Sequence, residues 1–367
     1  MKLKKITALL LSAAMLASLQ VAGCGNSVNA KAVAATLDDK EISIGLANFI
    51  AQVQAVQMDA TFLSYYGENM WSSDSGSGTT MEQSVKDSVM ERIQEYYLMD
   101  AHTADYKVEL TDQEKSEITA AAAKFLEENS ADAQKAMGAT QETVEEMLRL
   151  YKVQSKMRAA IEEQIDTNVT AEECAQKTFS YVRFNKSDNT ETTTDDAKDE
   201  KADAEDFLKA AADDMEKAAE AEEYTIQTCS YGTGDLTEEE NTTSMELDVL
   251  KAADKLKEKE LADSLVETDN GYYVVRMDST DDKAAAETKK ESILTQRRND
   301  QYDEVLQGYK DGCKWSINES EWEKVNFDEL YTVKQEETAT DDAEGTDSGT
   351  DETEGDTAGT EDENKTE

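Results

Sequence analysis

The hydrophobic periodicity of this chain changes near residue 178 and changes back near residue 283. Before the change, apolar residues recur at three- and four-residue intervals, which predicts amphipathic helices. Between the two points, short runs rich in aromatic and β-branched residues alternate with helical patterns. After residue 283 a long charged stretch again predicts a helix. We therefore expect an α+β fold, in which a helical domain assembled from both chain ends carries an inserted small α+β domain.

The helical part is predicted to open with a strand, a turn and a second strand over residues 33–43. An apolar stripe marks the first helix: Leu46, Phe49, Ile50, Val53, Val56, Ala60 and Leu63. Later helices are expected over residues 81–104, from 111 onward, from 138–140 to about 165, and over 283–311. Ser/Thr-x-x-Glu patterns at Thr111 and Thr170 are capping boxes, which start helices. A short apolar piece, with Trp315 and Trp322, follows the last helix.

The inserted part contains three predicted strands separated by helices and turns. The strands are expected at residues 178–184, 224–229 and 271–277, the helices at 197–222 and 245–257, and a turn at 231–236. From residue 336 onward the chain is almost entirely Thr, Asp, Glu and Gly. Such a segment has too little apolar surface to fold, so a disordered acidic tail is expected.

These patterns predict the following boundaries: signal peptide 1–23, tether 24–32, first part of the helical domain 33–170, inserted domain 171–281, returning helix and C-terminal part of the helical domain 282–333, and tail 334–367.

The N-terminus has the features of an export signal. Lys2, Lys4 and Lys5 precede an apolar run over residues 6–19, which is shorter than the roughly 20 residues that a membrane span needs. The run ends in Val-Ala-Gly-Cys24, which resembles the bacterial lipobox. The resemblance implies cleavage before Cys24, lipid on its thiol, and a location on the outer face of the cell membrane. An ordinary secretory signal that ends near a cysteine is the alternative.

Composition excludes several classes of function. The formal net charge is −45, and loss of residues 1–23, with three lysines and no acidic residue, takes it to −48. Such a surface repels nucleic acid, so nucleic-acid binding is excluded. Cys174, Cys229 and Cys313 have no metal-ligand spacing, so we expect free thiols, although one pair could oxidise outside the cell. His102 is the only histidine and is expected on a surface helix, which argues against a His-rich metal site. We expect no metal and no cofactor.

The order of these segments resembles the PrsA and SurA class of extracytoplasmic foldases, over about residues 33–327. In the helical part, Ala35-Thr-Leu-Asp-Asp-Lys-Glu-Ile42 resembles the family's A-x-V-N-G-x-x-I. The segments at 138–140 and 170–173 add to the resemblance. It implies a helical chaperone domain joined to a prolyl isomerase domain of the parvulin type.

The inserted part carries three parvulin-like motifs. Phe179-Ser-Tyr-Val182 resembles A-S-H-I, Gly234-Asp-Leu236 resembles G-G-D-L, and Asn270-Gly-Tyr-Tyr-Val-Val275 resembles F-G-Y-H-I-I. The resemblance places the following residues in the site: Tyr181 and Tyr273 at the positions of the two catalytic histidines, and Leu236, Met245 and Val249 against the substrate proline. Both histidines are thus tyrosines here, and the family's pocket phenylalanine is Val249.

Two interpretations of the tyrosine pair remain open. The hydroxyls of Tyr181 and Tyr273 could take over the hydrogen bonds of the imidazoles, because prolyl isomerisation needs no proton transfer. Alternatively the domain is degenerate and serves for packing or peptide binding, because loss of both imidazoles and of an aromatic wall removes orientation and contact area together.

The resemblance implies a lipid-anchored chaperone or foldase that binds unfolded or nascent secreted polypeptides, with weak or absent prolyl isomerase activity. A non-catalytic surface assembly or binding lipoprotein on the same scaffold is the first alternative. An active parvulin-type isomerase is the second. A solute-binding lipoprotein is disfavoured, because the repeated βαβ pattern of two α/β lobes is missing. The sequence indicates no oligomeric state.

Overall fold

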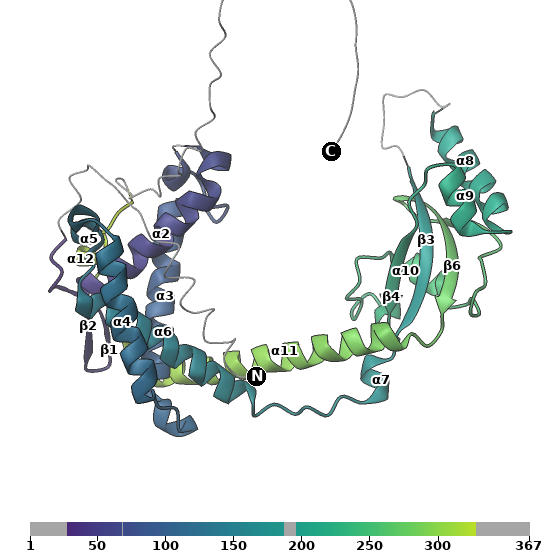
Figure 1. The fold of residues 1–367 in the computed structure, drawn as a ribbon. Helices are drawn as coiled ribbons and strands as arrows, with labels where there is room; N and C mark the ends of the chain where they lie inside the picture. Colours follow the sequence, from purple (N-terminus) through teal and green to yellow (C-terminus); the bar gives the residue numbers. More distant parts are fainter. Residues whose placement is uncertain (1–27, 68, 187–195, 328–367) are drawn as a thin grey trace, which may run out of the picture.

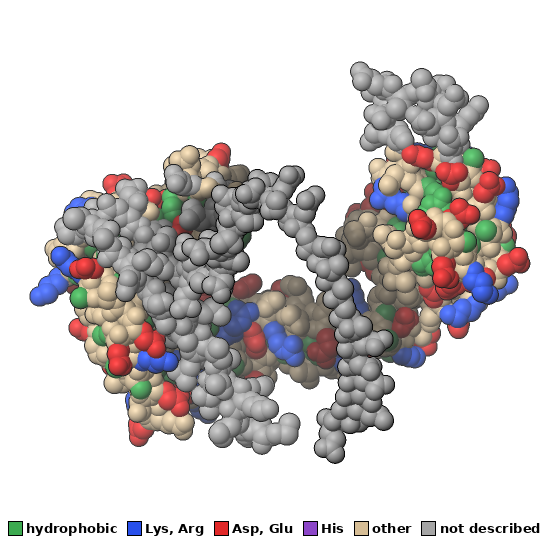
Figure 2. All heavy atoms as spheres, turned by 45° about the horizontal axis from the view of Figure 1, so that its top comes forward, with side chains coloured by type: hydrophobic (Ala, Val, Ile, Leu, Met, Phe, Trp, Pro, Cys, Tyr) green, Lys and Arg blue, Asp and Glu red, His purple; other side chains and the backbone are tan. Residues whose placement is uncertain are grey.

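The computed structural model describes residues 28–67, 69–186 and 196–327. The predicted signal peptide, Cys24 and the predicted acidic tail therefore lie outside the described residues. Figure 1 shows a helical part and a sheet-containing part at opposite ends of the long helix α11 (Lys283–Gly312). In Figure 2 the described atoms form two masses joined by a narrower arm, with acidic and basic side chains mixed over both.

The helical part opens with the antiparallel strands β1 (Val33–Leu37) and β2 (Lys40–Ser43), joined by a turn at Asp38, which has a φ of 51°. The elements that follow are α2 (Ile44–Tyr66), η1 (Met70–Ser72), α3 (Met81–Ala101), η2 (Thr103–Tyr106), α4 (Asp112–Glu128), α5 (Ala131–Met137), α6 (Gln141–Glu162) and α7 (Ala171–Cys174). Side chains of Thr111, Thr140 and Thr170 cap α4, α6 and α7 by accepting from backbone N–H groups one turn ahead. The expected capping boxes at Thr111 and Thr170 are thus confirmed.

The two chain ends meet in the helical part. Strand β7 (Trp315–Ile317) pairs antiparallel with β1, which gives a three-stranded sheet in the order β2-β1-β7. After β7, helix α12 (Glu319–Trp322) places Trp322 in the same buried core as Ile42 and Ile93. The buried Lys86 of α3 donates to the carbonyl of Val325 at 2.6 Å and so fastens this returning segment.

The inserted part is a four-stranded antiparallel sheet in the order β4-β3-β6-β5. Its strands are β3 (Lys177–Asn185), β4 (Gln227–Tyr231), β5 (Val266–Glu267) and β6 (Gly271–Ser279). Helices α8 (Asp196–Ala211) and α9 (Met215–Ala221) pack on one face, where Phe207 lies against Phe184. The other face is covered by η3 (Gly234–Leu236) and α10 (Leu247–Ala253). The chain is therefore α+β, as expected.

Helix α11 is held near its middle and toward its C-terminus. Near its middle, Arg297 donates to the carbonyls of Asp166 and Asn168 and pairs with Glu173 at 2.6 Å. Toward its C-terminus, the buried Tyr302 packs against α3 and α6. Among the described residues, no helix combines the length and the apolar character that crossing a bilayer requires.

The structure corrects several local expectations. The single helix predicted over residues 197–222 is two helices, because Asp214 leaves the helical conformation and its side chain caps α9. Helix α5, which Gly138 ends with a φ of 72°, was not expected. The strand predicted at 224–229 is shifted to β4, and neither β5 nor β7 was predicted.

Candidate functional site

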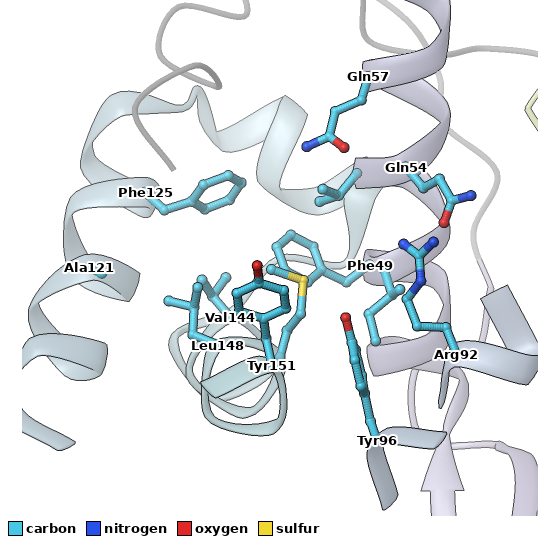
Figure 3. A pocket seen from close by; sticks show the side chains of 13 residues that line it. Phe49, Gln54, Gln57, Arg92, Tyr96, Ala121, Phe125, Val144, Leu148 and Tyr151 are labelled. Carbon is cyan, nitrogen blue, oxygen red and sulfur yellow. The ribbon is translucent and has the colours of Figure 1, made fainter. Parts of the chain in front are cut away.

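An apolar groove lies between three helices of the helical part (Figure 3). It has a volume of about 270 Å³. Its apolar lining comes from α2, α4 and α6, with Phe49, Ile50, Val53, Ala121, Phe125, Val144, Met147 and Leu148. The rings of Phe49 and Phe125 meet edge to face, with centroids 5.5 Å apart. A cavity of roughly 150 Å³ already holds a benzene ring, so this groove has room for one or two large side chains.

Polar groups border the groove. Gln54 and Gln57 come from α2, and Arg92 and Tyr96 from α3. Tyr151 of α6, which is 43% exposed, lies beside Val144 and Leu148 (Figure 3). Burial raises the pKa of Tyr96 to about 12, so its hydroxyl is a neutral hydrogen-bond donor at ordinary pH. The groove therefore combines an apolar floor with a few polar groups, which is the usual composition of a binding site.

This groove was not predicted from the sequence. Phe49, Val53, Phe125 and Leu148 lie on predicted apolar helix faces, and each is indistinguishable from a core residue by periodicity alone. One signal was present: Gln54 and Gln57 follow Val53 along the first helix and bring amides next to its apolar stripe.

The residues predicted to form the parvulin-like site gather on one face of the inserted sheet. Tyr273 and Val249 belong to the buried cluster beneath α10, and Tyr181, Leu236 and Met245 pack against it half-buried. The rings of Tyr181 and Tyr273 lie side by side, with centroids 5.8 Å apart. The structure thus brings all five residues together, and their roles remain predictions.

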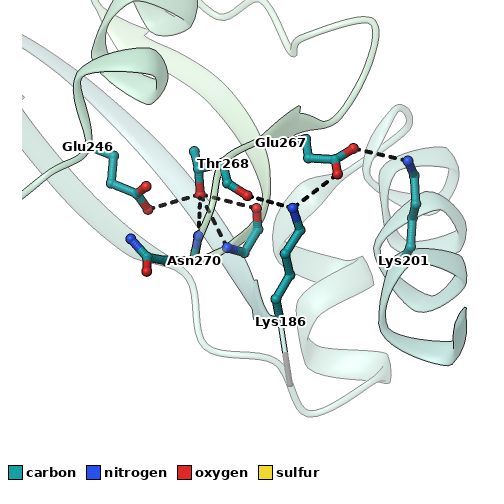
Figure 4. A network of polar contacts seen from close by, with 7 residues as sticks. Lys186, Lys201, Glu246, Glu267, Thr268 and Asn270 are labelled. Atoms are coloured by element: carbon teal, nitrogen blue, oxygen red, sulfur yellow. Dashed lines mark hydrogen bonds and ion pairs between the residues drawn. The ribbon is translucent and has the colours of Figure 1, made fainter. Parts of the chain in front are cut away.

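The hydroxyl of Tyr273 is bound to a carboxylate that was not predicted from the sequence. It donates to Oε1 of Glu246 at 2.7 Å. Thr268 donates to the same oxygen at 3.1 Å (Figure 4). Thr268 also holds the turn between β5 and β6, through its bonds to Asn270 and Gly271. Burial, followed by the bond to Glu246, raises the pKa of Tyr273. The phenol is therefore neutral and already satisfied.

The remaining groups of this face offer little chemistry. Burial raises the pKa of Tyr181, and it raises the pKa of the neighbouring Cys229 thiol to about 11, so neither ionises near neutral pH. Val249, which the resemblance places at the family's pocket phenylalanine, is fully buried beneath the neighbouring side chains of this face.

The same network extends away from the tyrosines. Glu267 of β5 pairs with Lys186 at 3.0 Å and with Lys201 of α8 at 3.1 Å (Figure 4). The Lys186 ammonium also donates to the carbonyl of Thr268 at 2.6 Å. These contacts tie α8 to the β5–β6 turn and so support Glu246 indirectly. Among the described residues, no group of three or more His, Cys, Asp or Glu side chains is arranged to hold a metal ion.

No protein-family model matches the chain, and no curated protein matches it. The solved structures that are similar include the following three. The foldase PrsA from Streptococcus pneumoniae is 21% identical with a TM-score of 0.28, covering 69% of this chain and 97% of its own. The foldase PrsA from Lactococcus lactis is 17% identical with a TM-score of 0.31, covering 81% and 100%. A structure from work on two SurA-like chaperones of Campylobacter jejuni is 10% identical with a TM-score of 0.27, covering 78% and 99%.

The chain resembles PrsA- and SurA-type foldases. This is the class to which the sequence analysis noted a resemblance. At TM-scores from 0.27 to 0.31 none of the three superposes on the chain as a whole, so the assignment of function rests on this chain's own residues.

Proposed function

We propose that this protein is an extracytoplasmic chaperone of the PrsA/SurA type, anchored by lipid on Cys24, that holds unfolded secreted polypeptides. The groove between α2, α4 and α6 carries this proposal. It is an apolar recess with an exposed tyrosine at its edge, which suits an apolar side chain of an unfolded segment.

The size of the groove fits transient holding. Burying one Leu or Phe side chain contributes roughly 1.5–3 kcal/mol. A millimolar dissociation constant already corresponds to about −4 kcal/mol, so one or two such side chains give weak, reversible binding. A chaperone needs to release its clients, and a net charge of −45 keeps a loaded complex soluble.

Prolyl isomerase activity is proposed to be weak or absent. Val249 is fully buried, and the Tyr273 hydroxyl is taken up by Glu246. Neither is free to contact a substrate proline. The inserted part then serves for packing or peptide binding rather than as an isomerase.

Suppression of aggregation of several unrelated unfolded proteins tests the proposal. The wild type is expected to suppress aggregation of most of them. Tyr151→Glu, which puts a charge at the edge of the groove, should weaken suppression for all. Ser155→Glu is the matched control, because it adds the same charge to an exposed position of α6 outside the groove lining.

Two results would contradict the proposal. Activity toward a single client only would indicate the alternative, a surface assembly lipoprotein with one partner. Equal loss in Tyr151→Glu and Ser155→Glu would show that charge on α6, and not the groove, decides the outcome.

A further inference from the structure

The polar side of the groove carries an arginine without an acidic partner. Arg92 of α3 is exposed and forms no ion pair with any residue that the structure describes. Arg149, Arg158, Arg276 and Arg297 each contact a carboxylate within 3 Å. Arg183 and Arg298 also form no ion pair among the described residues, but of the three unpaired arginines Arg92 is the one that lines the groove.

The carboxylate one turn farther along α3 is bound to other residues. Glu95 accepts from the Tyr302 hydroxyl of α11 and from Gln154 of α6 at 2.9 Å. Both partners lie outside the groove lining. Arg92 is thus left pointing its charge at the groove side, next to Gln54 and Tyr96 (Figure 3).

A second polar group in the groove lacks a partner. The Oε1 atom of Gln54 is buried and accepts no hydrogen bond in the described structure. A buried acceptor without a donor is costly. Because this oxygen has almost no exposed surface and its amide lies beside Arg92, the groups that a bound chain can reach are the apolar recess and the Arg92 guanidinium (Figure 3). A peptide segment with an apolar side chain and a neighbouring carboxylate offers a partner to both.

We propose, on the basis of the chaperone function above, that the groove selects apolar segments in which an acidic residue adjoins the apolar one, with Arg92 as the residue that determines this preference. The preference runs against the overall charge of the protein. A net charge of −45 attracts basic polypeptides at long range. Within the groove, however, the Arg92 guanidinium attracts a carboxylate of the bound segment.

Binding of three labelled decapeptides to the full mature chain tests the proposal. Each peptide carries Leu-Phe at its centre, flanked by Asp, by Asn or by Lys, and binding is followed by fluorescence anisotropy. The measured quantity is the ratio of the dissociation constants of the Asn and Asp peptides in the wild type, divided by the same ratio in Arg92→Gln. Dividing the two ratios cancels the effect of the protein's net charge on the peptides, because the wild type and Arg92→Gln have almost the same net charge.

An exposed charge pair supports an expected factor of about threefold to fivefold in favour of the Asp peptide. Arg92→Lys should retain part of it, because the charge remains. Arg298→Gln is the matched control, since it removes the same charge from α11 outside the groove lining, and it should give a factor of about one.

The outcomes separate this inference from the proposed function. A factor of one for Arg92→Gln, with aggregation suppression intact, overturns the acidic preference and leaves the chaperone proposal standing. Equal weakening of all three peptides shows that Arg92 only supports the packing of the groove, and also overturns it. If the wild type binds no peptide and suppresses no aggregation, both proposals fail.

Discussion

Replacing Tyr273 by phenylalanine removes one hydroxyl and leaves the buried ring in place. That hydroxyl donates to Glu246 at 2.7 Å. A hydrogen bond to a charged group contributes about 1.5–3 kcal/mol net. Glu246 is half-buried and keeps its bond from Thr268, so the loss should fall at the low end. We expect Tyr273→Phe to lower the free energy of unfolding by about 1–2 kcal/mol.

Tyr181→Phe is the matched control in the same site. The Tyr181 hydroxyl accepts and donates no hydrogen bond among the described residues, and its ring is half-exposed. The change should therefore cost less than about 0.5 kcal/mol. Urea unfolding of both variants and the wild type measures the difference. Equal losses at the two positions would refute the assignment of the energy to the Tyr273–Glu246 bond.

The effect of Tyr273→Phe should depend on pH in one direction. The pKa of Tyr273 is raised above its usual value of 10.0, so the folded state holds the phenolic proton more tightly than the unfolded state does. The contribution of the protonated Tyr273 hydroxyl to the free energy of unfolding is complete below pH 10. It is lost as pH rises through the higher folded-state pKa. The difference from wild type should shrink above pH 10, and a difference that grows there would contradict this account.

The same site also predicts the catalytic outcome. The wild-type rate on X-Pro peptides should be close to background. Histidine at both Tyr181 and Tyr273 should not restore it fully, because Val249 is buried and gives the proline ring no aromatic wall. A wild-type rate comparable to that of an ordinary parvulin would make the protein an enzyme and refute the holding function as its main role.

Three further predictions concern other parts of the chain. Cys24→Ser should release the protein from the membrane or leave its signal attached, and an unmodified Cys24 in the mass spectrum of membrane-bound wild type would refute lipidation. Deleting residues 336–367 should leave the melting temperature nearly unchanged, whereas a loss of several degrees would show that the tail docks on the body. Burial lowers the pKa of Lys86, so the folded protein loses this proton at a lower pH than the unfolded chain does. The free-energy cost of burying the charge therefore falls as pH rises toward 10.5, and the wild type should gain stability relative to Lys86→Met. A pH-independent difference in urea melts would contradict that sign.

Much of the secondary structure was predictable because its causes are local. Apolar spacing along α3, and the threonine caps of α4 and α7, act within one or two helical turns. Helix α2 formed where it was predicted, but it is buried on all sides over residues 44–53 instead of along one stripe. The exceptions have non-local or competing causes. Strands β5 and β7 are two and three residues long and exist because β6 and β1 pair with them. The break at Asp214 was missed because residues 197–222 favour helix throughout, and only the cap separates α8 from α9.

The sequence by itself determined, through strand alternation, which side chains share a face within each strand of the inserted part. That the strands of Tyr181 and Tyr273 are neighbours was implied only by the resemblance to parvulins, and the pairing of β3 with β6 puts the two rings on the same side. The sequence did not determine that Glu246 would hold the Tyr273 hydroxyl or that Val249 would be fully covered. The groove depended on tertiary structure altogether. Apolar stripes on α2, α4 and α6 predict burial equally well with or without a recess, and only the way these helices pack leaves space between Phe49, Phe125 and Leu148, with Arg92 of α3 beside it.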